Sequence, residues 1–130
     1  MIKVFPYDRF YTKVMDLSFW ISTKILRFGK YENESIIKFA AADENSNVLD
    51  YGCNTGRHAS FVKQAYGCNI MGADINAAAI AVCKSKGIAA ELISPKFFEK
   101  YKSSFDIIIN SHVLEHVDHP KDFLVNIRGM

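Results

Sequence analysis

The feature that most constrains the fold is the stretch from Val48 to Gly56, which reads VLDYGCNTG. A short apolar run ends in an acidic residue, Asp50, and a turn with two glycines precedes the next helical pattern. Glycine has no Cβ, so Gly52 lets the backbone approach a ligand closely, and Asn54 tolerates a positive φ. The helix behind the turn would present free N–H groups and a partial positive charge. This stretch predicts a strand, a ligand-binding turn and a helix.

A second predicted strand, residues 69–74, also ends in an acid. Asp74 lies 18 residues after Gly56, close to the offset of about 20 residues at which an acidic residue binds ribose hydroxyls in dinucleotide-binding folds. Both segments have a plainer interpretation. The first turn could only pack a helix on a strand, and Asp74 could only start the next helix, with Asn76 as its cap.

The glycine spacing does not match the dinucleotide fingerprint, which places glycines at positions one, three and six. Counted from Gly52, the third and sixth positions are Asn54 and Arg57. The spacing acid-x-Gly-x-Asn-x-Gly instead resembles the first motif of class I S-adenosylmethionine-dependent methyltransferases, acid-x-Gly-x-Gly-x-Gly, with Asn54 in place of the middle glycine. The segment 105–120, FDIIINSHVLEHVDHP, is similar to the fourth strand of that family and the loop after it.

The resemblance, which runs from about Asn47 to Arg128, implies an α/β fold with a Rossmann-like doubly wound parallel sheet. About four strands in the order 3-2-1-4 are expected after two N-terminal helices. The expected strands are 47–51, 69–74, 88–93 and 105–110. The expected helices are 7–28, ending at Gly29, then 34–42, 56–66, 76–86, 95–102 and one that starts near Pro120.

We expect a single domain, residues 1–130, with a helical extension at 1–46 and a cofactor-binding half at 47–130. The family's sheet usually has seven strands, so we expect the domain to lack its C-terminal part. Strand 105–110 would then lie at an edge although it reads as an interior strand. Self-association through this strand is expected if the chain is a fragment.

The resemblance also implies S-adenosylmethionine as the cofactor. Asp50 and Gly52 would border its methionyl portion, Asp74 would accept hydrogen bonds from the ribose hydroxyls, and Ile75 would pack on the adenine. The predicted cofactor-binding residues are Asp50, Gly52, Cys53, Asn54, Gly56, Asp74, Ile75 and Asn110. Methyl transfer from a sulfonium is a direct displacement, so it needs positioning and the exclusion of water but neither a nucleophile nor a metal.

The segment HVLEH, residues 112–116, formally matches the zinc-hydrolase motif H-x-x-E-H. On a helix, His112 and His116 would bind zinc with Glu115 as general base. Against this, the segment follows a predicted buried strand, where a loop is expected, and few residues remain to supply a further acidic ligand. We predict no metal site. His116 is a candidate catalytic base at the acceptor site, and plain loop structure is the alternative.

The composition restricts which binding partners the chain can be expected to have. The chain has 16 basic and 14 acidic residues and a net charge of +2, and no run of basic residues indicates nucleic acid. Charges interrupt the apolar residues near the N-terminus, which excludes a signal peptide or a spanning helix there. The amphipathic segment 7–28 could pack on the domain, cover an acceptor pocket or, least favoured, contact a membrane surface. Three cysteines without a CxxC pair fit reduced thiols of a cytoplasmic protein.

Two classes of function remain after this reasoning. The first is a methyltransferase that acts on a small or lipid-like acceptor, with the acceptor atom undetermined because one fold hosts many chemistries. The second is a non-catalytic module that binds the cofactor or a partner without turnover. Cofactor binding combined with no methyl transfer would distinguish the second class from the first.

Overall fold

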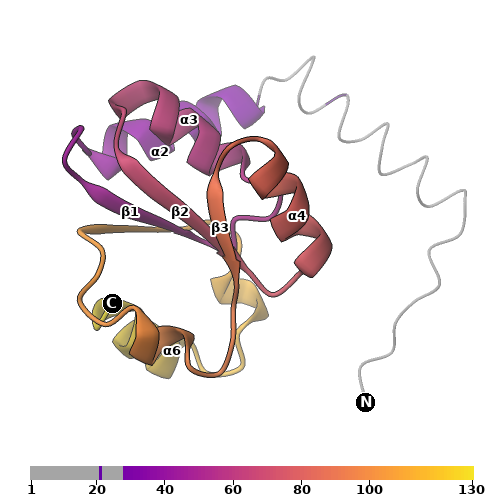
Figure 1. Ribbon diagram of the computed structural model, residues 1–130, viewed down its shortest axis with the longest axis vertical. Coiled ribbons are helices and arrows are strands. Elements are labelled where there is room, and N and C mark those ends of the chain that lie inside the picture. Colours follow the sequence, from indigo (N-terminus) through magenta and orange to yellow (C-terminus); the bar gives the residue numbers. More distant parts are fainter. Residues whose placement is uncertain (1–20, 22–27) are drawn as a thin grey trace, which may run out of the picture. The chain divides into compact units, whose positions relative to one another are not determined.

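Four short apolar segments form a parallel sheet in the computed structural model (Figure 1), which describes residue 21 and residues 28–130. The strands are β1 (Asn47–Tyr51), β2 (Asn69–Asp74), β3 (Ala89–Leu92) and β4 (Ile107–Asn110). Their order in the sheet is β3-β2-β1-β4, which confirms the predicted order, and all pairings are parallel. The predicted strands 88–93 and 105–110 are both shorter in the structure: β3 loses one residue at each end, and β4 begins two residues later than predicted.

β1 is an inner strand of the sheet, with β2 on one side of it and β4 on the other. Asp50 lies between Gly72 of β2 and Ile109 of β4 in the register of the strands. From β1 the chain adds β2 and then β3 on one side, and it then crosses over to add β4 on the other side. The order of the strands therefore reverses beside β1. A crevice at the carboxyl ends of the strands is expected at such a point, which is where open α/β sheets bind ligands.

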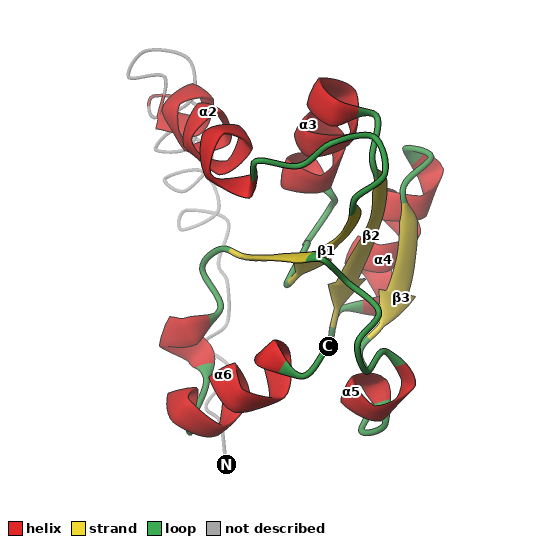
Figure 2. Ribbon diagram, turned by 90° about the vertical axis from the view of Figure 1, so that its left-hand side faces the viewer, coloured by secondary structure: helices red, strands yellow, loops and turns green. Residues whose placement is uncertain are grey.

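Helices cover both faces of this sheet (Figures 1 and 2). Helices α3 (Arg57–Tyr66) and α4 (Ala77–Ser85) bury one set of apolar side chains against it, and α5 (Phe97–Lys100) and α6 (Pro120–Arg128) bury another. Strand residues therefore alternate between two cores, with Val48 in the first and Leu49 in the second. Phe97 and Leu49 are fully buried, and each such burial stabilises the fold by roughly 1.5–3 kcal/mol.

Local sequence signals set the ends of these helices. α3 ends at Gly67, whose φ of 68° is left-handed and whose N–H bonds to the carbonyl oxygen of Lys63. The side chain of Asn76 caps α4 by accepting hydrogen bonds from the N–H groups of Ala78, at 3.0 Å, and Ala79, at 3.3 Å. Pro120 is the first residue of α6, where its missing N–H costs nothing. The predicted helix 95–102 is reduced to the four residues of α5.

The N-terminal part of the prediction needs a correction. Helix α2 spans Phe28–Ala40, so the predicted helix 34–42 was placed too late, and Gly29 lies inside a helix instead of ending one. Glycine is tolerated there because it lies in the first turn, where N–H groups have no helical partner. The predicted helix 7–28 lies outside the described residues except for residues 21 and 28. Residues 36–130 form one compact unit, in which Ile36 packs on the first core.

Across the residues that the structure describes, no helix combines the length and the apolar character that crossing a membrane would require.

Candidate functional site

The turn after β1 is held by the end of β2. Gly52 and Asn54 both have positive φ, 77° and 49°. The N–H groups of Gly52 and Cys53 both bond to the carbonyl oxygen of Ala73, at 2.7 and 3.0 Å. The next N–H, that of Asn54, donates to Oδ2 of Asp74 at 2.8 Å. Three consecutive N–H groups of the turn are thus bound by two consecutive residues, which gives the turn a defined shape.

Asp50 lies beneath this turn and is almost completely buried, with 1% of its surface exposed. Its Oδ2 accepts a hydrogen bond from the N–H of Ala59 at 3.1 Å. This bond satisfies one of the helix-start N–H groups of α3, because the residue at the cap position, Gly56, has no side chain to do so. Asp50 was predicted to border the cofactor, and the structure places its carboxyl where it anchors α3.

Burial raises the pKa of the Asp50 carboxyl to about 6. The hydrogen bond from Ala59 opposes this rise, the negative charge of Asp74 adds to it, and the positive charge of Arg57 again lowers the pKa. The result is a carboxyl group whose charge is costly in the folded chain. Acidic side chains with strongly shifted pKa values in a crevice are typical of functional sites, although structural hydrogen-bond networks also produce such shifts.

Asp74 joins the two turns that follow β1 and β2. Its Oδ1 accepts a hydrogen bond from the N–H of Asn76 at 2.9 Å, and its Oδ2 accepts the one from Asn54. The first bond fits the plainer interpretation of Asp74 as a residue that starts a helix, with Asn76 as the cap. A carboxylate has about four acceptor positions, so acceptor capacity remains for a ligand. The neighbouring Ile75 is 80% exposed, which leaves an apolar surface beside the carboxylate.

The inner side of the turn is packed around small residues. A Cβ at Gly56 would lie 2.6 Å from Sγ of Cys83, and one at Gly72 would lie 2.6 Å from Sγ of Cys53. The Cys53 side chain is buried in the first core, and burial raises the pKa of its thiol. Only the main chain of Cys53 could therefore make the predicted contact with a cofactor. Sequence reasoning missed the role of Cys83, because no local pattern marks a contact between α4 and this turn.

The loop after β4 lies against the same turn. Asn110 ends β4 beside Tyr51 of β1, and its Oδ1 is a buried acceptor without a hydrogen-bond partner among the described residues. A Cβ at Gly52 would collide with the side chain of Val113. Sequence reasoning expected open space above Gly52 and missed Val113, which no motif signalled. The structure thus brings Gly52, Asn110 and Val113 together at one corner.

The histidine-rich part of this loop does not form the helix that the zinc-hydrolase alternative would require. Residues Leu114–His116 form a single 3-10 turn, which confirms the expected loop in place of an α-helix. Nδ1 of His112 lies 3.3 Å from Oε1 of Glu115, and both side chains are largely exposed. In the described part of the chain, no three histidine, cysteine, aspartate or glutamate side chains are grouped so that they could hold a metal ion. His116 is exposed on the loop.

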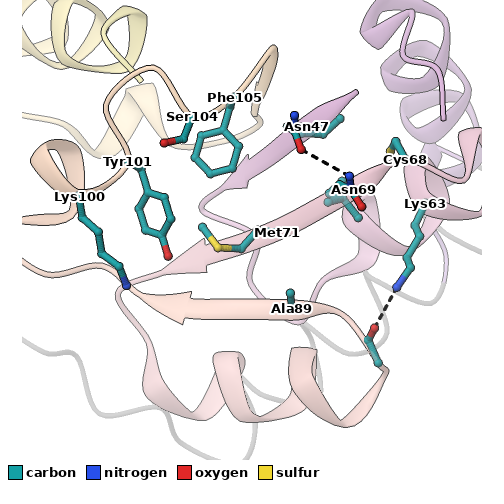
Figure 3. A pocket seen from close by; sticks show the side chains of 13 residues that line it. Asn47, Lys63, Cys68, Asn69, Met71, Ala89, Lys100, Tyr101, Ser104 and Phe105 are labelled. Carbon is teal, nitrogen blue, oxygen red and sulfur yellow. Dashed lines mark hydrogen bonds between the residues drawn. The ribbon is translucent and has the colours of Figure 1, made fainter. Parts of the chain in front are cut away.

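A separate hollow of about 590 Å³ lies at the opposite, amino edge of the sheet. Figure 3 shows the side chains of Met71, Tyr101 and Phe105 facing it, with Lys63 and Lys100 at its margin. The Nζ of Lys63 bonds to the carbonyl oxygen of Gly87 at 3.2 Å, and Lys100 pairs with Glu91. None of the predicted site residues lines this hollow. Its size does not make it the candidate site, because its charged groups already have partners.

Comparison with known families gives one match: a family model described as a methyltransferase domain matches residues 25–129. Comparison with curated proteins gives no match.

Several solved structures are similar to the chain. The YcgJ protein from Bacillus subtilis has a TM-score of 0.66 and 20% identity, and the similarity covers 75% of this chain and 44% of that one. A SAM dependent methyltransferase from Archaeoglobus fulgidus has a TM-score of 0.64 and 20% identity, covering 86% and 52%. The geranyl diphosphate C-methyltransferase from Streptomyces coelicolor, in complex with geranyl diphosphate and S-adenosyl-L-homocysteine, has a TM-score of 0.52 and 14% identity, covering 69% and 35%. The chain thus spans about half or less of the length of these proteins, and at these identities the likeness shows the fold.

Proposed function

Since the chain belongs to the methyltransferase domain family, we propose that it binds S-adenosylmethionine at the carboxyl edge of its sheet and takes part in methyl transfer to a small or lipid-like acceptor. The observation that carries this proposal is the Asp74 carboxylate, fixed by two main-chain N–H groups beside the left-handed turn. The geranyl diphosphate enzyme, whose acceptor is lipid-like, supports this choice of acceptor class.

The ribose and adenine of the cofactor fit the end of β2. The acceptor capacity that remains on Asp74 suits the two ribose hydroxyls, and the exposed surface of Ile75 suits one face of the adenine. A hydrogen bond to a charged group contributes roughly 1.5–3 kcal/mol, which corresponds to about ten- to hundredfold in affinity. Asp74 would therefore be the largest single polar contribution to binding.

The methionyl end of the cofactor fits the corner between β1 and β4. The unpartnered Oδ1 of Asn110 is an acceptor that suits an ammonium group, and leaving it unmatched costs stability in the free chain. The positive end of α3 suits a carboxylate. Gly52 lies at the same corner, where Val113 packs on it. A ligand at Gly52 would therefore contact or displace the Val113 side chain.

When bound, the cofactor would supply a methyl group already activated by its sulfonium charge. The residues of the chain would hold it in line with the acceptor and exclude water from the reacting atoms. His116 is our candidate for accepting a proton from the acceptor, because it lies on the loop that borders this corner. The alternative class of function, cofactor binding without turnover, would need the same contacts but no such base.

The remaining partners stay predictions. They are self-association through the outer edge of β4, and contact of residues 7–28 with a membrane surface, which we favour less. We propose a cytoplasmic setting because Cys53, Cys68 and Cys83 are buried and form no disulfide.

The experiment that tests the cofactor proposal replaces one carboxylate. Asp74→Ala should weaken the binding of S-adenosylhomocysteine by about tenfold or more, because a charge-assisted contact is lost. Calorimetric titration gives the affinity, and urea unfolding gives the stability of the same variant. Glu44→Ala, which removes an exposed carboxylate from the turn before β1, is the matched control and should change neither. A loss of about 1 kcal/mol in stability at unchanged affinity would show that Asp74 only starts a helix.

A further inference from the structure

Asn54 occupies the one position of the turn where the related motif has a glycine and this chain does not. Its φ of 49° lies in the left-handed region. This conformation brings Cβ close to the following carbonyl group, and asparagine tolerates it better than other residues but not without cost. The side chain is exposed, so packing does not force the conformation. The hydrogen bonds of the turn therefore hold it there. One of them joins the N–H of Gly56 to the carbonyl oxygen of Cys53 at 2.8 Å and spans Asn54.

Two kinds of bond hold the turn. Gly52 and Cys53 donate to the carbonyl oxygen of Ala73, a main-chain acceptor that a side-chain substitution leaves in place. Asn54 donates to the carboxylate of Asp74. The N–H of Gly56 also donates to the main chain, at the carbonyl oxygen of Cys53. Among these four N–H groups, only that of Asn54 depends on a side-chain acceptor. This bond is also charge-assisted, and such bonds are stronger than those between neutral groups.

The Asp74 carboxylate is well suited to this task because it is itself fixed. Its Oδ1 is held by the N–H of Asn76 at 2.9 Å, and the Asn76 side chain caps α4. The orientation of Asp74 is therefore coupled to the start of α4 as well as to the first turn. A disturbance at Asp74 would reach both turns that border the carboxyl edge.

We infer that Asp74 is a positioning residue for the first turn, and that asparagine at position 54 makes the shape of this turn depend on it. The part of the inference that concerns affinity rests on the proposed function, since it adds to the proposed ribose contact of the same carboxylate. The part that concerns the turn itself does not. With glycine at position 54 the left-handed conformation costs little, so the turn keeps its shape without Asp74.

Hydrogen exchange on the ligand-free chain tests the turn directly. In Asp74→Ala, the amide of Asn54 should exchange at least about tenfold faster, since its acceptor is gone and local opening becomes easier. The amide of Ser60, which donates to the carbonyl oxygen of Gly56 at 3.0 Å, is the internal control and should keep its rate. An unchanged rate at Asn54 would overturn the inference. If Asp74→Ala does not fold, Asp74→Asn replaces it. Asn54 and Asn76 donate to different oxygens of the carboxylate, and asparagine keeps only one oxygen and loses the charge.

A double-mutant cycle on S-adenosylhomocysteine affinity tests the second part, with Asp74→Ala and Asn54→Gly alone and combined. The affinity of Asn54→Gly alone is the reference for the loss that Asp74→Ala causes in that chain. The loss caused by Asp74→Ala should be about threefold or more smaller in the Asn54→Gly chain than in the native chain, because contacting residues are not additive. Equal losses in both chains would overturn the coupling and leave the ribose contact standing. If even the native chain binds no S-adenosylhomocysteine, the proposed function fails and the exchange experiment alone decides the inference.

Discussion

The two edges of the sheet hold their polar groups in opposite ways. At the carboxyl edge, Asp50 has 1% of its surface exposed, and Oδ1 of Asn110 is buried with no hydrogen-bond partner in the described part of the chain. At the amino edge, the Lys63 side chain is exposed, and its Nζ donates to the carbonyl oxygen of Gly87 at 3.2 Å. The amino edge has the hollow of about 590 Å³. The carboxyl edge has the groups whose burial costs free energy.

This difference teaches that the volume of a hollow is a poor guide to the functional site of such a domain. Water compensates exposed polar groups, so the bond of Lys63 at the amino edge adds little to stability. A buried carboxyl or an unpartnered amide oxygen destabilises the fold unless it serves another purpose. The carboxyl edge contains both, together with a left-handed turn, and that is why we place the ligand there.

The largest effect that separates the two edges is expected at a pair of glycines with the same backbone conformation. Gly56 at the carboxyl edge and Gly87 at the amino edge both have a φ of 74°. A Cβ at Gly56 meets the Cys83 sulfur, and one at Gly87 meets nothing within 4 Å. Gly87→Ala should lose about 1–2 kcal/mol for its left-handed conformation. Gly56→Ala should lose up to about 5 kcal/mol, because overpacking is added.

Urea unfolding of both variants measures these losses. Equal losses at Gly56 and Gly87 would mean that the core beneath the turn can move aside. The two edges would then tolerate an added methyl group equally well, and the interpretation of the turn as rigid would be wrong.

A smaller effect, about 3 kcal/mol at most, is expected from the ionisation of Asp50. Its pKa is raised from 3.8 to about 6 in the folded chain. The folded state therefore binds a proton that the unfolded state has released at pH values between about 4 and 6. Stability should fall as the pH rises through this window, because ionising a buried carboxyl favours unfolding. Above pH 6 the full loss is present, at about 1.4 kcal/mol for each unit of the shift.

Asp50→Asn should remove this fall, since the amide keeps an oxygen that can accept from Ala59 but cannot ionise. In measurements from pH 4 to pH 8, the unfolding free energy of the variant should increase relative to that of the native chain as the pH rises. Asp122→Asn, at an exposed residue of α6, is the control and should follow the native curve. If the stability of the native chain does not fall with pH in a way that depends on Asp50, then the burial of this carboxyl is not costly. The contrast between the two edges would then weaken.

Local chemistry predicted most of the fold. The apolar runs gave the strands. Asn76 and Pro120 gave the starts of two helices, because these residues act through their own backbone or their nearest neighbours. The strand order came from the resemblance to the methyltransferase family, and the structure confirms it. Helix α2 was misplaced because Gly29 was taken as a helix end, although a glycine in a first turn does not stop a helix.

The candidate site was predicted in its outline and missed in its contacts. The turn and the second acid were found because their residue types are unusual at those places. The bond from Ala59 to Asp50, the contact of Cys83 with Gly56 and the packing of Val113 on Gly52 were not found. Each of these joins residues from different elements, and neither spacing nor residue type marks such a pairing in a single sequence.

The most direct test of the central claim is to map which amides respond to the cofactor. In a titration of the isotopically labelled chain with S-adenosylhomocysteine, followed by amide chemical shifts, the turn from Gly52 to Gly56 and the residues from Asp74 to Asn76 should move most. The amides of Asn69 and Ala89, which line the hollow at the amino edge, should stay in place. Shifts concentrated at Lys100 to Phe105 and the start of β3, with the turn unmoved, would place the ligand in the hollow and contradict this account.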